Sequence, residues 1–152
     1  MVKLIAIGAD HGGFRLKEKI KTVLKKNRYK VKDWGTYSPE PCDYPEFGFA
    51  VAGEVSSGKA SGGIVICKTG IGMAVVANKF PGVRAGVCNS VKDAVSARQH
   101  NDTNVLVLAA TKVGNGKKAL SIVKAWLTTK ALGDRHARRV RQIRAFEKKV
   151  FK

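Results

Sequence analysis

Cys67 is the side chain with the most evident reactivity in this sequence, and its neighbours indicate what it could do. It ends the apolar run 63–67 and precedes Gly70 and Gly72, where a helical pattern begins. Glycines let the backbone approach a ligand, and a helix N-terminus attracts negative charge and favours thiolate. The segment predicts a loop that binds a phosphate or an oxyanion, with Cys67 as base or nucleophile. A small buried side chain ending a strand is the alternative.

Histidines and arginines supply the other candidate groups. Asp10 and His11 follow the first apolar run, and His100 lies late in a helical pattern. Imidazole exchanges protons near neutral pH, although each histidine could equally be a hydrogen-bonded structural residue. Arg135 and Arg139 are four residues apart, so they share one helix face and could clamp a phosphate; a solvated basic tail is the alternative. The histidine spacings do not fit metal ligands, so we expect no metal. Neither a Walker loop nor a dinucleotide fingerprint is present, because Phe14 follows Gly13 and Val75 ends the Gly70-x-Gly72 stretch, and we expect no cofactor.

Short apolar runs alternate with helical patterns along the chain. Continuous runs, typical of strands covered on both faces, predict strands at 3–8, 30–34, 62–67, 83–88 and 104–109. Helical spacing predicts helices at about 13–27, 45–58, 71–79, 91–99, 115–130 and 135–148. This alternation indicates a three-layer α/β/α sandwich with a five-stranded parallel sheet (Rossmann-like) and an extra C-terminal helix. Ligands should then bind at the carboxyl ends of the strands, where Asp10 and Cys67 stand.

Composition narrows the class of protein. The chain has 152 residues, which fits a single domain over 1–152, and no apolar stretch approaches the roughly 18 residues of a membrane span. Three cysteines without a C-x-x-C pair suit a reducing compartment, and the short N-terminal apolar run looks like a strand rather than a signal peptide. We therefore expect a cytoplasmic protein without membrane attachment.

Charge suggests a different class of function. The net charge is +18, from 29 basic and 11 acidic residues, which would suit binding to nucleic acid. Only 7% of residues are aromatic, and the basic stretches lack the interleaved stacking residues of single-strand binders. Solvated faces of amphipathic helices explain most of the lysines, so nucleic acid is a disfavoured partner.

Taken together, several segments in one register resemble the type B ribose-5-phosphate isomerases and the related galactose-6-phosphate isomerase subunits. The resemblance extends over nearly the whole chain. The matching stretches are 8–14 with Leu16-Lys17, Asp43-Tyr44-Pro45, 63–67, 69–73, 77–80, 82–85, 98–106, Arg135-His136 and Arg139-Val140.

The resemblance implies a metal-free aldose–ketose isomerase of the pentose phosphate pathway that acts through an enediolate. Cys67 would move a proton between C1 and C2, and Thr69 and the amides up to Gly72 would hold the enediolate oxygen. His100, helped by Asp10, would open the furanose ring. Cys67 as a covalent nucleophile stays open on the residues alone.

Substrate binding follows from the same resemblance. Tyr44 and Asn101 would contact the sugar, and His11, Arg135 and Arg139 would take the phosphate. The family is built as a dimer with shared sites, so His100 and the C-terminal helix, about 135–148, should come from the partner subunit. We expect a homodimer, which could pair into a tetramer.

Two positions depart from the family pattern. Lys68 stands where Gly usually follows the catalytic cysteine, and Thr111 with Lys112 stands where the ribose isomerases commonly carry Arg. We expect the Lys68 side chain to point away from the enediolate or toward the phosphate. Lys68, Gly70 and Gly72 are therefore counted among the expected substrate-binding residues. Ribose 5-phosphate is the leading substrate; a six-carbon sugar phosphate such as allose or galactose 6-phosphate is the alternative.

Overall fold

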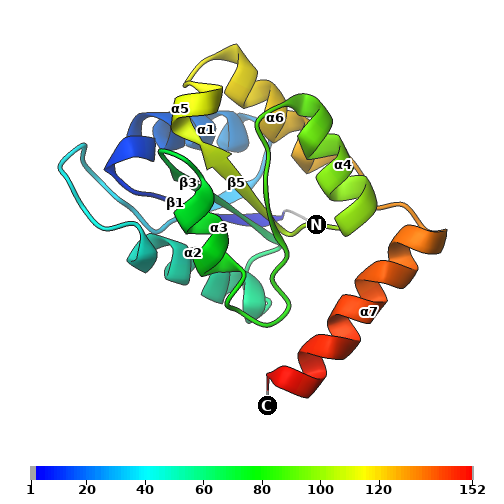
Figure 1. Ribbon diagram of the computed structural model, residues 1–152. Coiled ribbons are helices and arrows are strands. Elements are labelled where there is room, and N and C mark those ends of the chain that lie inside the picture. The colour runs from blue at the N-terminus through cyan, green and yellow to red at the C-terminus, as the bar shows by residue number, and fades with distance from the viewer. Residues whose placement is uncertain (1–2, 152) are drawn as a thin grey trace.

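The computed structural model describes residues 3–151, in which five parallel strands form one sheet (Figure 1). The strands are β1 (Leu4–Ala9), β2 (Lys30–Asp33), β3 (Gly62–Cys67), β4 (Ala85–Val87) and β5 (Val105–Ala109). Their order across the sheet is β2-β1-β3-β5-β4, with Cys67 opposite Ala109 in the register of β3 and β5. All five strands were predicted, and the parallel sheet is confirmed.

The predicted helices form within a few residues of their expected bounds. They are α1 (Phe14–Lys26), α2 (Pro45–Ser56), α3 (Ile71–Ala77), α4 (Val91–Asn101), α6 (Lys117–Thr128) and α7 (Asp134–Val150). Two short helices were not predicted, the 3-10 turn η1 (His11–Gly13) and α5 (Ala110–Val113). Both directly follow a strand, so they set the start of the loops at the carboxyl edge of the sheet.

Helices cover both faces of the sheet, as the sandwich prediction requires. Alternate residues of each strand point to opposite faces. In β1, Ile5 and Ile7 join the cluster under α1, α4 and α6, whereas Ala6 joins the cluster under α2 and α3. On α1, the side chains of Leu16 and Ile20 are buried against the sheet. The three-layer α/β/α fold is therefore confirmed.

Helix α7 lies at one side of this sandwich and packs against α4 (Figure 1). Within the described range of α7, Val140 is the one buried residue, and Ile143 stays 45% exposed. Neither core cluster contains a residue of α7. The sandwich is thus packed without help from the C-terminal helix.

Candidate active site

Cys67 ends β3 at the carboxyl edge of the sheet and is 5% exposed. Gly70 has a positive φ of 75°, which turns the chain sharply into α3 and is the conformation that glycine tolerates best. This turn brings the Gly70 N–H within 3.2 Å of the Cys67 Sγ, which accepts its hydrogen bond. Thr69 Oγ1 accepts from the Ile71 N–H at 3.3 Å. The structure thus forms the predicted tight loop, with the cysteine sulfur turned into it.

Asp10 lies beside this loop, at the end of the neighbouring strand. Its backbone N–H donates to the Ile66 carbonyl, which ties the end of β1 to the end of β3. The carboxylate is 7% exposed and caps η1, because Oδ1 accepts from the N–H groups of Gly12 and Gly13 at 3.0 and 3.3 Å. The second oxygen remains available to a ligand or a proton.

The Lys68 side chain lies against the η1 turn. A Cβ built on Gly12 would lie 2.6 Å from the Lys68 Cγ and 3.4 Å from its Cε, so the lysine stem lies across Gly12. Thr111 fixes the Lys68 backbone, since its N–H and its hydroxyl both donate to the Lys68 carbonyl, at 3.1 and 2.6 Å. The two departures from the family pattern therefore contact each other.

The segment between β2 and α2 orients His11 and ends at Tyr44. The Nδ1 of His11 lies 3.1 Å from the backbone N and 3.2 Å from the carbonyl oxygen of Cys42, so the loop orients the ring in either tautomer. The ring of Tyr44 lies directly over Gly72, where a Cβ would come within 2.6 Å of the tyrosine Cζ. The contact between Cys42 and His11 was not predicted, because no local pattern links residues 31 positions apart.

His100 is not part of this cluster. It lies in the last turn of α4, and the chain then reaches Asn104, whose carbonyl accepts from Gly63 at the amino end of β3. Gly63 and Cys67 are four residues apart in one strand, a span of about 13 Å. Within one chain, His100 and Cys67 therefore occupy opposite edges of the sheet.

The imidazole of His100 stacks on that of His136 in α7, with ring centroids 4.3 Å apart and an interplanar angle of 11°. Loss of hydration, together with the charges of His100, Arg135 and Arg139, lowers the pKa of His136 from its ordinary value. This histidine pair is a feature that sequence reasoning missed, because it requires two helices to meet.

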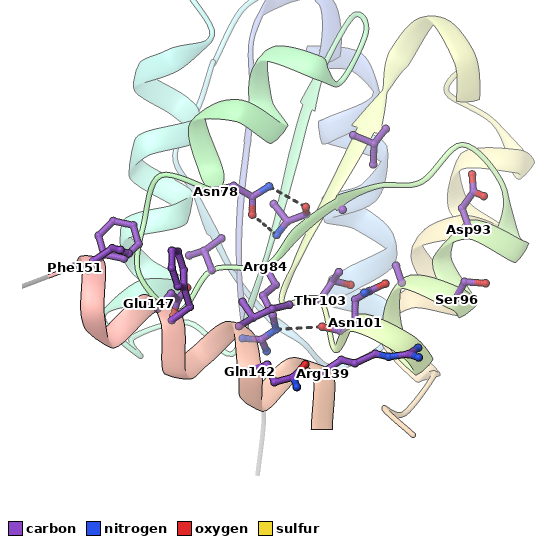
Figure 2. A pocket seen from close by; sticks show the side chains of 18 residues that line it. Asn78, Arg84, Asp93, Ser96, Asn101, Thr103, Arg139, Gln142, Glu147 and Phe151 are labelled. Carbon is purple, nitrogen blue, oxygen red and sulfur yellow. Dashed lines mark hydrogen bonds between the residues drawn. The ribbon is translucent and has the colours of Figure 1, made fainter. Parts of the chain in front are cut away.

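Asn101 and Arg139 also lie away from Cys67, in a groove of about 990 Å³ between α4, α7 and the edge strand β4 (Figure 2). Figure 2 shows Arg84 at this groove, where its Nε donates to the Asn101 carbonyl at 3.2 Å. Val87 also lines the groove, and its side chain borders Gly70 of the Cys67 loop. Arg135 is exposed on the first turn of α7.

The predicted site residues thus form two groups in one chain. Asp10, His11, Tyr44 and the loop 67–72 meet at the carboxyl edge, and the second group, His100, Asn101, Arg135 and Arg139, lies on α4 and α7. No described helix is long and apolar enough to cross a membrane, and within residues 3–151 no three His, Cys, Asp or Glu side chains are grouped as metal ligands.

Comparison with known proteins identifies the family. Residues 5–143 match the family model described as Ribose/Galactose Isomerase. Ribose-5-phosphate isomerase B of Escherichia coli (strain K12) is 46% identical over 148 residues, which are 97% of this chain and 99% of that protein.

Solved structures agree with this match. Ribose-5-phosphate isomerase B of Clostridium thermocellum superposes with a TM-score of 0.92 at 49% identity, covering 96% of this chain and 98% of that one. The Mycoplasma genitalium enzyme with bound ribulose 5-phosphate gives 0.92 at 39% identity, covering 97% of both chains. The chain therefore belongs to the ribose/galactose isomerase family, and its fold is that of the type B ribose-5-phosphate isomerases.

Proposed function

We propose that this isomerase interconverts ribose 5-phosphate and ribulose 5-phosphate through an enediolate. One observation carries the proposal: the Cys67 sulfur is turned into a tight glycine loop, with Asp10 and Tyr44 beside it. Proton transfer next to a carbonyl needs a base beside an oxyanion site, and this loop supplies both. The bound ribulose 5-phosphate of the Mycoplasma genitalium relative supports the choice of substrate.

The chemistry assigned to Cys67 is general base catalysis. Its thiolate takes the proton from C2 of the open-chain aldose, and the electrons of that C–H bond form the C1–C2 double bond of the enediolate. Thr69 and the loop amides stabilise the oxygen that becomes negative. The proton then returns to C1 while the O2 proton passes to O1, which yields the ketose without a redox cofactor.

The remaining roles require a second copy of the chain. His100, with Asp10, opens the furanose ring; Tyr44 and Asn101 contact the sugar; His11, Arg135 and Arg139 bind the phosphate. His100 and Cys67 lie at opposite edges of one sheet, which supports the proposal that His100 reaches the site from a partner. Exposed apolar side chains, Ile71 on α3 at 67% and Phe146 on α7 at 64%, offer surface for such a contact.

We therefore infer a homodimer with shared sites, which could pair into a tetramer. The cysteines Cys42, Cys67 and Cys88 are free in the structure, which fits the reducing conditions of the cytoplasm, where we place the reaction.

Solvent deuterium exchange tests the assigned base. Cys67→Ala should abolish exchange of the substrate C2 hydrogen and lower turnover by about 10²–10⁴-fold, the usual contribution of a general base. Cys88→Ala is the matched control, because Cys88 is a buried thiol in the opposite core cluster, and it should exchange at the wild-type rate. Exchange in Cys67→Ala at the wild-type rate would show that another group is the base.

Isomerisation rates measured on ribose 5-phosphate, allose 6-phosphate and galactose 6-phosphate test the substrate. We expect the highest kcat/KM with ribose 5-phosphate. A higher value with a six-carbon phosphate would replace the proposed substrate by the alternative.

A further inference from the structure

A cavity of about 330 Å³ opens beside η1, on the side of the turn that faces α5 and the segment after it. Its lining includes His11, Gly12, Arg15, Ala110 and Asn115. His11 and Arg15 are four residues apart and both border this space, so an imidazole and a guanidinium face one cavity from the same turn of the chain. The functions assigned above use His11 but leave Arg15 without a role.

The charge of Arg15 is not neutralised by the surrounding protein. Its side chain is exposed, and none of the ion pairs among residues 3–151 includes it. Glu18, the one acidic residue of α1, is paired with Lys21 at 2.8 Å and lies 3.7 Å from Lys17. Asp10 is the nearby carboxylate of the turn, and its Oδ1 already accepts two backbone N–H groups.

Lys68 adds a second cation near the turn. Its stem crosses Gly12, and Thr111 holds its backbone from α5 by two hydrogen bonds. Gly12 therefore contacts the Lys68 stem and also lines the cavity together with His11 and Arg15. A dianion bound in this cavity would lie beside the Arg15 guanidinium and the His11 imidazole, with the Lys68 charge nearby.

We propose that Arg15 binds the phosphate group of the sugar phosphate in this cavity, together with His11 and, across Gly12, Lys68. The planar guanidinium donates two parallel hydrogen bonds to phosphate oxygens, whereas Lys68 contributes a point charge. Only the identity of the ligand rests on the proposed function; the anion site itself rests on the geometry of this chain. The consequence is that one chain can hold the phosphate before Arg135 and Arg139 of a partner close over it.

Titration with inorganic phosphate tests the site directly. In full-length protein at low ionic strength, Arg15→Met should raise the calorimetric Kd for phosphate at least tenfold, and Arg15→Lys should restore part of the affinity. Lys19→Met is the matched control, because it removes the same charge from the next turn of α1, where the side chain is also exposed. We expect less than a twofold change in that variant. Thermal unfolding should be the same in all three variants, since Arg15 has no ion pair in the described chain to lose.

Kinetics extend the same test to the substrate. Arg15→Met should raise KM for ribose 5-phosphate about tenfold with kcat within about twofold, because phosphate binding contributes before and during the reaction. Equal phosphate affinity in Arg15→Met and Lys19→Met, or no measurable phosphate binding by the wild type, would overturn the proposal. If no sugar phosphate is isomerised, the proposed function fails while the phosphate titration still decides the role of Arg15.

Discussion

A buried ion pair between Lys17 of α1 and Asp33 of β2 offers a direct test of how this helix is held against the sheet. The Lys17 side chain is completely buried, with Nζ 2.7 Å from Asp33 Oδ2 and 3.7 Å from Glu18 Oε2. Asp33 has more partners, since Lys21 lies 2.6 Å from the same oxygen and the Gly35 N–H donates to Oδ1 at 2.8 Å. Asp33 therefore keeps two close partners when Lys17 is replaced, whereas Lys17 keeps Glu18 at 3.7 Å when Asp33 is replaced.

The expected cost of each substitution follows from this inequality. Asp33→Asn leaves the buried ammonium with Glu18 as its nearest carboxylate and should destabilise the protein by about 3–5 kcal/mol, the usual result of stranding a buried charge. Lys17→Met removes the buried ammonium and leaves Asp33 paired with Lys21 and the Gly35 N–H, so no buried charge is stranded and we expect a loss of about 1 kcal/mol or less. The double variant should be more stable than Asp33→Asn alone.

Chemical denaturation and thermal unfolding at pH 7 measure these differences. For a chain of this length, about 1 kcal/mol corresponds to roughly 2–4 °C in Tm, so Asp33→Asn should unfold about 6–20 °C below the wild type. A cost for Lys17→Met equal to that of Asp33→Asn, or no recovery in the double variant, would refute the reasoning.

The pH dependence gives an independent check. Burial alone would raise the pKa of Asp33, but hydrogen bonds from Lys17, Lys21 and the Gly35 N–H, with the Lys17 charge, lower it below its ordinary value. A lowered pKa contributes stability that is present above the unfolded value, about 3.9, and is lost as the pH falls through the folded value. The stability difference between the wild type and Asp33→Asn should therefore shrink below about pH 4.

Three further predictions concern the site and its surroundings. Gly72→Ala should raise KM for isomerisation of the sugar phosphate severalfold with an unchanged circular dichroism spectrum, because the new Cβ would displace the Tyr44 ring; an unchanged KM would show that this contact does not matter. Burial, with the charge of Asp93, raises the pKa of Cys88 from 9.0 to about 12. The native protein should therefore leave Cys88 unalkylated by iodoacetamide at pH 8, and mass spectrometry showing a labelled Cys88 would contradict this. The stability that the protonated thiol contributes should be lost as the pH rises from about 9 toward 12. Truncation after Leu132 removes α7 but no residue of either core cluster, so circular dichroism should show a folded product. The truncated protein should lose isomerase activity because Arg135 and Arg139 are removed, whereas full activity would exclude the shared site.

Local patterns were enough to predict the strands and the six longer helices of the sandwich, and the loop that follows Cys67. Continuous apolar runs identify strands that are covered on both faces. A helix cap also depends only on residues close in sequence: at the start of α4, the Asp93 N–H donates to Ser90 Oγ at 3.0 Å. The loop after Cys67 is equally local, because a positive φ at Gly70 follows from the residue type and its place between a strand and a helix. The family resemblance added the roles of these residues, which spacing alone left open.

Tertiary structure decided which of these residues meet. The lysines of α1 were interpreted as a solvated face, and that holds for Lys19 and Lys25 but not for Lys17, which is buried because β2 brings Asp33 to it. The contact of Cys42 with His11 and the stacking of His136 on His100 likewise join residues that are distant in sequence. Periodicity reports the environment along one element, whereas strand order and helix packing depend on the summed contacts of all the elements. For that reason only the folded chain separates His100 from Cys67 by the length of a strand.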